Sequence, residues 1–486
     1  VIKDSVLFHG VTGSGKTEVY IRLIKEIIDE GKQVLYLLPE IALTTQIIVR
    51  LQKIFGDSVG VYHSKFNLNE RVELWNDMLR PNPKFKVILG ARSALYLPFS
   101  NLGLIIVDEE HENTFKQFDP APRYNGRDIA IRRAWMTKCP IVLGSATPSM
   151  ESWWNATVRN ISKLHTMKHR APGLVMPKIE LINMNHEFTD NGQDFALFSD
   201  RLIQAMNTTL DSNGQVLILL NRRGFAPWIV CKERTCDWLM KCDHCDSAMV
   251  FHRKKPLQNS GFVRCHHCSK EQRIPNTCPD CESNVVVRGA GTQRAEELLR
   301  NMLEIDWTAI ARLDSDSATS ASTIQKTLEK FADGEIRVLL GTQMIAKGLD
   351  FPNVKLVGVL NADASIDLPD FRASERTYQL VSQVCGRCGR GAGESIAIIQ
   401  SRDPNTPPIK LASQGAYEMF ANAAKKTSLS PIGVVEISSS ALSRDLSCRS
   451  DLFSFSNSYN PSINALLSVR EIINSISLSI ASYPLK

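Results

Sequence analysis

The sequence predicts an α/β fold of two parallel-sheet lobes, with a cysteine-rich, zinc-binding insertion in the second lobe. Short apolar runs alternate with helical stretches in two separate series along the chain. This alternation is typical of the buried strands of a parallel sheet. A glycine-rich phosphate-binding motif follows the first of these runs, and eight of the 12 cysteines lie between 231 and 281. A chain of 486 residues is also too long for a single hydrophobic core.

The composition narrows the class of protein. A hydrophobic content of 43% and a charged content of 22% are ordinary for a globular protein. The net charge of +6 is mildly basic and is compatible with a nucleic-acid partner. No stretch approaches the ~18 apolar residues of a membrane span, so no membrane partner is expected. The first residues, "VIKDSVLFHG", are not a signal peptide, which predicts a cytoplasmic, reducing location with thiols free to bind metal.

The first lobe is predicted over residues 1–155, followed by a connection over 156–212. Between its strands, 17–30 has apolar residues at helical spacing, and Gly31 is the expected end of that helix. The predicted strands are "VLFHG" (6–10), "VLYLLP" (34–39), "VILG" (87–90), "LGLIIVDEEH" (102–111) and "IVLGSATPS" (141–149).

The second lobe is predicted over 213–230 and 282–425, interrupted by the insertion at 231–281. The serine-rich tail at 426–486 has no clean period, and we predict neither a fold nor a function for it. The predicted strands are "VLILLN" (216–221), "VVV" (285–287), "IRVLLGTQ" (336–343), "KLVGVLNAD" (355–363) and "SIAIIQS" (395–401).

The phosphate-binding motif is "GVTGSGKT" (10–17), which fits G-x-x-x-x-G-K-[ST]. It follows a predicted strand and opens a predicted helix, which is the context that the motif requires. Backbone N–H groups would face the phosphates of ATP, Lys16 would reach the β- and γ-phosphates, and the Thr17 hydroxyl would hold Mg²⁺. The predicted ATP-binding residues are Gly10, Val11, Thr12, Gly13, Ser14, Gly15, Lys16 and Thr17.

An acidic motif, "DEEH" (108–111), ends the fourth predicted strand of the first lobe. Asp108 is placed to hold Mg²⁺, directly or through water. Glu109 is the better candidate to orient and deprotonate the attacking water.

Five motifs in this order resemble helicase superfamily 2. The resemblance implies two RecA-like lobes, a Ser-Ala-Thr motif that links nucleotide state to lobe movement, and Arg387 and Arg390 as catalytic arginines facing the γ-phosphate. The motifs are "GVTGSGKT", "DEEH", "GSATPS" (144–149), "GTQMIAKGLDFPNV" (341–354) and "QVCGRCGR" (383–390).

The cysteines of the insertion have the spacing C-x4-C, x5, C-x2-C, x19, C-x2-C, x9, C-x2-C. Four pairs predict two structural zinc sites of four thiolates each, and spacing alone leaves open which pairs share a metal. "CGRC" (385–388) has no second pair nearby, so we predict two packed or half-exposed thiols there. The predicted zinc ligands are Cys231, Cys236, Cys242, Cys245, Cys265, Cys268, Cys278 and Cys281.

Over roughly residues 6–425 the chain resembles the PriA family of bacterial primosomal replication-restart helicases, through stretches such as "LPEIALTTQ" (38–46), "LNRRGFAP" (220–227) and "PDFRASERTYQLVSQV" (369–384). The resemblance implies that the outer cysteine pairs share one zinc and the inner pairs the other. The first pair is C-x4-C where the family has C-x2-C. The resemblance further implies 3′→5′ movement on single-stranded DNA. The partners that it implies are forked DNA, primosome proteins and single-strand-binding proteins.

The family carries a 3′-end-binding domain and a winged helix upstream of its motor, and the sequence here starts nine residues before the phosphate-binding motif. We therefore expect fork-specific recognition to be lost even where the motor is whole. In "FKQFDPAPRY" (115–124), aromatic residues alternate with Lys116 and Arg123, which suits contact with a single strand. Alternatives are a zinc-ribbon nucleic-acid-binding adaptor with a weak or inactive motor, and a superfamily 2 RNA helicase or duplex translocase.

Overall fold

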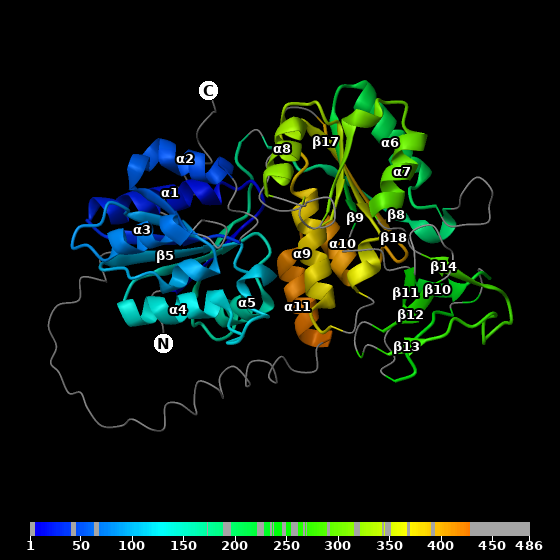
Figure 1. Ribbon diagram of the computed structural model, residues 1–486, viewed down its shortest axis with the longest axis horizontal. Helices are drawn as coiled ribbons and strands as arrows, with labels where there is room; N and C mark the ends of the chain where they lie inside the picture. Colours follow the sequence, from blue (N-terminus) through cyan, green and yellow to red (C-terminus); the bar gives the residue numbers. More distant parts are fainter. Residues whose placement is uncertain are drawn as a thin grey trace. The chain divides into compact units, whose positions relative to one another are not determined.

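A computed structural model gives the structure of the chain, which divides into two compact units (Figure 1). The first unit comprises the residues up to Val175 together with those from Ala416 onward, and the second comprises Met176–Gly415. The structure describes residues 5–39, 45–62, 68–172, 174–187, 196–220, 228–233, 236, 238–244, 249–253, 261–265, 268, 270–288, 292–314, 321–342, 345, 351–366, 370–389 and 394–427.

The first unit is built on a seven-stranded parallel sheet in the order β3-β4-β2-β5-β6-β1-β7. The predicted strands all lie in it, and β3 and β7 were not predicted. Its strands are β1 (Ser5–Gly10), β2 (Gln33–Leu37), β3 (Val59–Tyr62), β4 (Val87–Gly90), β5 (Leu102–Asp108), β6 (Ile141–Ser145) and β7 (Lys163–Met167).

Helices cover both faces of this sheet, with α1 and α2 on one face and α4 and α5 on the other (Figure 1). The helix that starts in the phosphate-binding motif ends as predicted, because Gly31 takes the left-handed conformation (φ 75) just beyond it. The helices are α1 (Lys16–Asp29), α2 (Thr45–Phe55), η1 (Gly56–Ser58), α3 (Leu68–Met78), η2 (Arg92–Tyr96), η3 (Asn113–Phe115), α4 (Gly126–Thr137), α5 (Met150–Thr157) and α11 (Tyr417–Thr427).

The second unit is built on a six-stranded parallel sheet in the order β15-β16-β9-β17-β18-β8. Helices α6 and α7 cover one face, and α9 and α10 the other (Figure 1). The elements are β8 (Lys178–Asn183), η4 (Met184–His186), α6 (Asp200–Asp211), β9 (Gln215–Leu220), α7 (Thr292–Met302), η5 (Trp307–Ala309), β15 (Ile310–Leu313), α8 (Ala321–Ala332), β16 (Val338–Gly341), β17 (Val354–Leu360), η6 (Ala362–Ser365), α9 (Ala373–Cys385), β18 (Ile396–Ser401) and α10 (Pro407–Ser413).

The insertion forms its own five-stranded antiparallel sheet, in the order β13-β12-β11-β10-β14. The prediction that 285–287 is a strand of the second lobe was wrong. These residues pair antiparallel with β10, so they belong to the sheet of the insertion. The strands are β10 (Trp228–Cys231), β11 (Val250–Arg253), β12 (Gly261–Arg264), β13 (Glu271–Gln272) and β14 (Val285–Arg288).

Two further boundaries differ from the prediction. The predicted connection at 156–212 is divided between the units, because β7 joins the first sheet and β8 and α6 join the second. Helix α11 belongs to the first unit, although 282–425 was predicted as the second lobe. The serine-rich tail lies outside the described residues from 428 onward.

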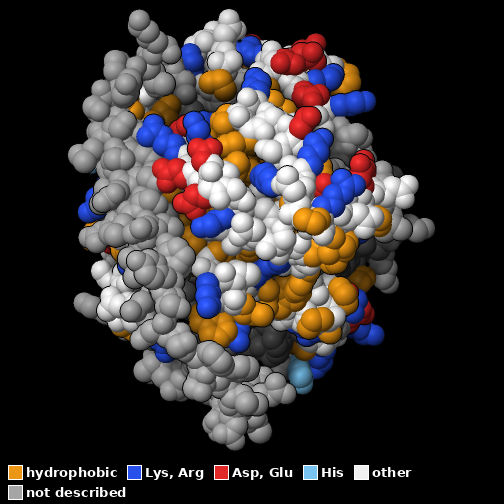
Figure 2. All heavy atoms as spheres, turned by 90° about the vertical axis from the view of Figure 1, so that its left-hand side faces the viewer, with side chains coloured by type: hydrophobic (Ala, Val, Ile, Leu, Met, Phe, Trp, Pro, Cys, Tyr) orange, Lys and Arg blue, Asp and Glu red, His pale blue; other side chains and the backbone are white. Residues whose placement is uncertain are grey.

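The charged side chains are mixed on the face of the molecule that Figure 2 draws. Figure 2 shows one face, on which Lys and Arg side chains are scattered among acidic and apolar side chains and form no single basic patch. Among the described residues, no helix is both long enough and apolar enough to cross a membrane.

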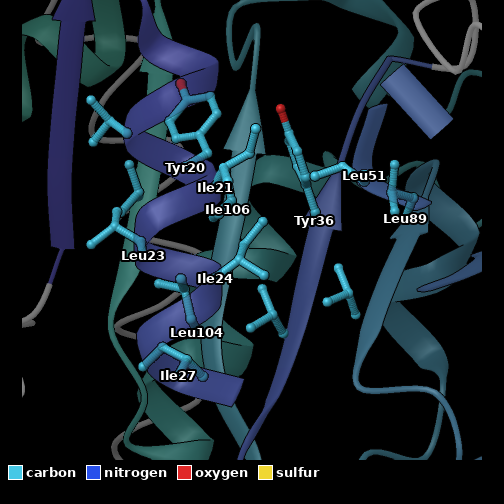
Figure 3. Packing of buried hydrophobic residues seen from close by; sticks show 14 of the residues in the cluster. Tyr20, Ile21, Leu23, Ile24, Ile27, Tyr36, Leu51, Leu89, Leu104 and Ile106 are labelled. Atoms are coloured by element: carbon cyan, nitrogen blue, oxygen red, sulfur yellow. The ribbon is translucent and has the colours of Figure 1, made fainter. Parts of the chain in front are cut away.

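The core of the first unit lies between α1, α2 and the sheet (Figure 3). Helix α1 contributes Tyr20, Leu23 and Ile24, which pack against Tyr36 of β2 and Ile106 of β5. This packing fixes the start of α1, and with it the phosphate-binding motif, relative to the end of β5. The core therefore positions the two motifs of the candidate site.

Candidate nucleotide site and metal centres

The phosphate-binding loop connects β1 to α1 and depends on its glycines. Gly13 (φ 79) and Gly15 (φ 89) are both left-handed, a conformation that other residues rarely adopt. A Cβ atom on Gly10 would lie 2.6 Å from the Ser14 Oγ. The Ser14 N–H donates to the Val11 carbonyl at 3.0 Å, which closes the loop on itself. The resulting turn leads directly into the amino end of α1, where free N–H groups favour an anion.

Lys16 is the first residue of α1 and lies over this loop. Its Nζ donates to the Gly10 carbonyl at 2.7 Å. Burial and the charge of Glu109 raise the pKa of Asp108, and the positive charge of Lys16 opposes this rise. Lys16 therefore lies near both the loop and the carboxylate at the end of β5.

Asp108 is held by two tyrosines. The Tyr20 hydroxyl donates to its Oδ1 at 3.1 Å, and the Tyr36 hydroxyl donates to its Oδ2 at 3.3 Å. Burial, followed by the charge of Glu109, raises the pKa of Asp108 to about 6. We did not predict these tyrosines, although a buried phenol needs a hydrogen-bond partner and that requirement was the available signal.

Glu109 adopts a left-handed backbone conformation, with φ 50. Its Oε2 is buried and has no hydrogen-bond partner among the described residues, and His111 Nδ1 lies 3.7 Å away. A strained backbone and an unsatisfied carboxylate oxygen are typical of a functional site. Hydroxyl and carboxylate oxygens from Thr17, Asp108 and Glu109 are the donors that a hard divalent cation such as Mg²⁺ prefers.

The acidic motif is joined to the Ser-Ala-Thr motif. His111 Nδ1 and Ser145 Oγ are 2.8 Å apart, and the Thr147 N–H donates to the same Ser145 Oγ at 2.9 Å. These bonds connect the end of β5 to the end of β6. A change at one motif can therefore reach the other through one serine side chain.

Glu110 anchors the same two motifs from within the core. Its carboxylate accepts from the Ser149 N–H at 2.6 Å, from Ser152 Oγ at 2.8 Å and from Arg127 at 3.1 Å. Burial opposes ionisation of Glu110, but Arg127 and the Ser149 amide outweigh it and hold the pKa below its usual range. Glu110 therefore stays charged in the interior.

Replacing Arg127 by methionine should lower the free energy of unfolding by about 3–5 kcal/mol, because it leaves the buried Glu110 charge without its partner. Urea unfolding of the purified chain measures this. Arg132→Met is the control, because Arg132 is an exposed residue of the same helix. A loss below about 1 kcal/mol for Arg127→Met would contradict the importance of this ion pair.

Helix α11, which follows the second unit in the sequence, also contacts residues next to the nucleotide site. The Tyr417 hydroxyl of α11 donates to the Pro148 carbonyl at 2.6 Å, and its ring centroid lies 5.2 Å from that of His9. His9 directly precedes the phosphate-binding loop, and its Nε2 lies 3.2 Å from the Ala146 carbonyl. Burial, followed by the charge of Lys16, lowers the pKa of His9 to about 4, so the ring is neutral at pH 7. We did not predict the contact between Tyr417 and Pro148, since 269 residues separate them in the sequence.

The insertion contains two clusters of cysteine sulfurs. In the first, the Sγ atoms of Cys231, Cys236, Cys278 and Cys281 all lie within 4.8 Å of one another. Cys231 and Cys281 are 3.3 Å apart, and Cys236 and Cys278 are 3.7 Å apart, too far for disulfides. Four sulfurs around a zinc ion at ~2.3 Å would be separated by about 3.8 Å. The cluster therefore fits a tetrahedral metal.

The thiols of this cluster differ in acidity, because burial raises the pKa of Cys231 to about 12 while hydrogen bonds from the backbone act in the opposite direction. The Glu233 N–H donates to the Cys231 Sγ at 3.3 Å. A hydrogen bond from the Ser283 backbone, followed by one from Cys231, lowers the pKa of Cys281 to about 7. Glu282 has φ 60, which turns the chain directly after Cys281.

The second cluster contains Cys242, Cys265 and Cys268, again within 4.8 Å of one another. Cys242 and Cys268 are 3.5 Å apart, and the Cys268 N–H donates to the Cys265 Sγ at 3.5 Å. The predicted fourth ligand, Cys245, lies outside the described residues. This grouping into outer and inner pairs is the one that the family resemblance implies.

Comparison with known proteins gives two helicase families. The family described as DEAD/DEAH box helicase matches residues 1–153, and the family described as helicase conserved C-terminal domain matches residues 270–392. The chain therefore carries the two domains of a helicase.

Curated relatives match most of the chain. It is 41% identical over 415 residues to the replication restart protein PriA of Bacillus subtilis, covering 85% of this chain and 50% of the relative. It is 38% identical over 417 residues to that of Treponema pallidum, covering 86% and 60%. The chain belongs to the PriA family. It spans about half the length of the B. subtilis PriA that it matches.

Solved structures support the fold alone. The DNA-bound DUF1998 helicase MrfA matches with a TM-score of 0.52 at 14% identity, covering 86% of this chain and 49% of that one. The Mss116p structure bound to single-stranded RNA and AMP-PNP matches with a TM-score of 0.50 at 12% identity, covering 97% and 83%.

The arginine motif of this PriA-family chain begins in the last turn of α9. Arg387 is half-buried, and its N–H donates to the Val384 carbonyl at 3.0 Å, while Arg390 lies outside the described residues. The Cys385 and Cys388 side chains between them are buried, and the Cys388 Sγ lies 3.3 Å from the Lys355 carbonyl. Both thiols therefore pack within the second unit.

The aromatic stretch after the acidic motif divides into core and surface. Phe115 is 1% exposed and belongs to the core, so it was wrong to group it with residues that contact a strand. Phe118 is 64% exposed, and Tyr124 lies edge-on to Tyr96 with ring centroids 5.7 Å apart. The Arg92 guanidinium lies 5.9 Å from the centroid of the Tyr124 ring. Aromatic and basic groups remain accessible on this loop.

Proposed function

We propose that this chain is the motor portion of an ATP-dependent DNA helicase that moves 3′→5′ on single-stranded DNA and acts in replication restart. The observation that carries the proposal is that a glycine-dependent phosphate loop and a buried aspartate lie near one lysine in the same lobe. Lys16 donates a hydrogen bond to the loop, and its charge acts on the pKa of Asp108. The preference for DNA and the role in restart are supported by relatives named replication restart protein PriA.

Each residue of the nucleotide site has a proposed part. The loop from Gly10 to Thr17 binds the phosphates through backbone N–H groups, and Lys16 exchanges its bond to Gly10 for one to a phosphate oxygen. Thr17 and Asp108 would hold Mg²⁺, which would neutralise charge that develops on the phosphates. Glu109, whose Oε2 lacks a partner among the described residues, orients the attacking water and accepts its proton.

Hydrolysis must then be passed on to movement. Asp108, Glu109 and His111 share one turn, and His111 is joined to the Ser-Ala-Thr motif through Ser145. Arg387 and Arg390 are proposed to reach the γ-phosphate from the second lobe, so that bound ATP favours closure and hydrolysis releases it.

The cysteine clusters are proposed to hold two structural zinc ions. One set is Cys231, Cys236, Cys278 and Cys281, and the other is Cys242, Cys245, Cys265 and Cys268. A shell of four thiolates leaves no position for water, so these sites support the fold of the insertion and take no part in ATP chemistry. The insertion would engage DNA or primosome proteins, and single-strand-binding protein is a further proposed partner.

ATP turnover with and without single-stranded DNA is the deciding test, with single-stranded RNA of the same sequence as the matched control. We expect stimulation by DNA and much less by RNA, together with displacement of a strand from a duplex with a 3′ tail but not a 5′ tail. Equal stimulation by RNA would favour the RNA helicase. Absence of turnover with either would favour an adaptor with an inactive motor.

A further inference from the structure

Two fully buried tyrosines point their hydroxyl groups at the carboxylate that ends β5. Tyr20 of α1 and Tyr36 of β2 are each 0% exposed, and Figure 3 shows both rings with their hydroxyl groups at the same end of the core. Tyr20 donates to Oδ1 of Asp108 at 3.1 Å and Tyr36 donates to Oδ2 at 3.3 Å. Both oxygens of the carboxylate are therefore bound by side chains from different elements.

Packing alone does not explain this choice of residue. The other residues of this core are apolar and include Phe8, whose ring packs against Tyr20, and phenylalanine would fill the same space without burying a hydroxyl group. The two rings lie edge to face with centroids 5.7 Å apart, so their planes are fixed by each other as well as by the core. Two fixed donors that bind the two oxygens of one carboxylate define the plane of that carboxylate.

The adjacent strand leaves room for this arrangement. Gly144 of β6 lies opposite Asp108 in the sheet register. A Cβ atom on Gly144 would lie 1.7 Å from the Tyr20 hydroxyl oxygen and 3.3 Å from Asp108 Oδ1. Any larger residue at this position would therefore displace the Tyr20 hydroxyl from the carboxylate.

The carboxylate keeps free capacity for a metal ion. Oδ1 accepts from Tyr20 and from the Glu109 N–H at 3.1 Å, while Oδ2 accepts from Tyr36. An ionised carboxylate offers about four lone-pair sites, so these three bonds orient the group without saturating it. This is the arrangement of outer partners that orient a metal ligand.

We propose that Tyr20 and Tyr36 are positioning residues, which hold the Asp108 carboxylate in the plane that binds the divalent cation of the ATP complex, in space that Gly144 leaves open. The inference rests on the proposed ATP-dependent function. It assigns to the two tyrosines a role in metal binding that is separate from nucleotide binding by the phosphate loop.

The test measures binding of a fluorescent ADP analogue in the absence of turnover, first without metal and then over a Mg²⁺ titration. We expect Tyr20→Phe and Tyr36→Phe each to raise the Mg²⁺ concentration for half-maximal effect about fivefold, and the double variant ten- to thirtyfold, because each removes one hydrogen bond to a charged group. Affinity without metal should stay within twofold of the parent.

Tyr62→Phe is the matched control. Tyr62 is a buried tyrosine of the same sheet, and its hydroxyl accepts from Arg71 at 3.4 Å instead of binding Asp108. It should leave the Mg²⁺ dependence unchanged. Gly144→Ala provides an independent variant, because it should reproduce the effect of Tyr20→Phe with both hydroxyl groups still present.

The outcomes separate this inference from the proposed function. A folded double variant with an unchanged Mg²⁺ dependence would overturn the positioning role while leaving the helicase proposal intact. So would an equal loss of affinity with and without metal, since that pattern indicates a purely structural role. A parent chain that binds no nucleotide at any Mg²⁺ concentration would overturn the proposed function, and this inference with it.

Discussion

Replacing Lys16 by alanine should abolish ATP hydrolysis while leaving the fold intact. Its Nζ is held over the phosphate loop by the Gly10 carbonyl at 2.7 Å, at the amino end of α1. In the proposed reaction this ammonium neutralises charge on the β- and γ-phosphates, and a preorganised charge of this kind contributes about 10²–10³-fold to the rate. Steady-state phosphate release in the presence of single-stranded DNA measures the loss.

Lys16 is half-buried and is not part of the hydrophobic core of the first unit, so its removal should change the melting temperature little. Lys25→Ala is the matched control, because Lys25 lies on the same helix and is exposed to solvent. The control should hydrolyse ATP at the parental rate. Phosphate release by Lys16→Ala within twofold of the parent would disprove the assignment of the loop.

The sequence was most informative where a function is carried by neighbouring residues. The phosphate loop is contiguous, its glycines predict left-handed turns, and the short apolar run before it predicts a buried strand. The predicted strands of the first lobe all lie in the first sheet for the same reason. The two-lobe fold follows from these runs and from the helices between them.

Strands at the edges of the sheets were harder to predict. β7 and β8 each end the strand order of their sheets, and most of their residues are half-buried. An edge strand buries less surface and needs no continuous apolar run, so 156–212 looked like a connection. The strand at 285–287 posed the opposite problem, because an apolar run does not reveal which sheet it joins.

Contacts between distant core residues could not be predicted where no motif marks them. Tyr20 and Tyr36 fit the apolar periodicity of α1 and β2, so nothing local separated them from other core residues. Their partner, Asp108, lies 88 and 72 residues away. The same limit applies to Tyr417 and Pro148, which only the docking of α11 on the first unit brings together.

The cysteine spacing lies between these cases. C-x2-C pairs predict a metal site, but only the folded chain determines which of the four pairs share a metal. The antiparallel pairing of β10 with β14 places Cys231 opposite Val285, and this brings the first cysteine pair to the last one. Cys242 then groups with Cys265 and Cys268 among the described residues. The first pair joins its cluster even with four residues between its cysteines, where the family has two.

Changing Cys265 to serine should release about one equivalent of zinc from a parent that binds two. Cys265 is fully buried and packs with Cys242, Met249 and Phe251 in the small core of the insertion. So small a core gains much of its stability from a metal, so loss of this zinc should loosen the core around Cys265 while the other cluster keeps its own zinc. Cys278→Ser should release the other zinc, and Cys139→Ser, a buried cysteine of the first unit, should release none. Metal analysis of the purified proteins measures all three.

The same variants should separate unwinding from ATP hydrolysis. The loop and carboxylates of the proposed ATP site lie in the first unit, whereas both cysteine clusters lie in the second. Within the second unit, the insertion that holds the clusters has its own antiparallel sheet, separate from the six-stranded parallel sheet. DNA-stimulated hydrolysis by Cys265→Ser should therefore stay within a few fold of the parent, while strand displacement falls much further. A parent that binds one zinc or none would contradict the two clusters. Equal loss of hydrolysis and strand displacement in the variant would mean that the insertion contributes to the DNA-stimulated motor itself and is not an independent module.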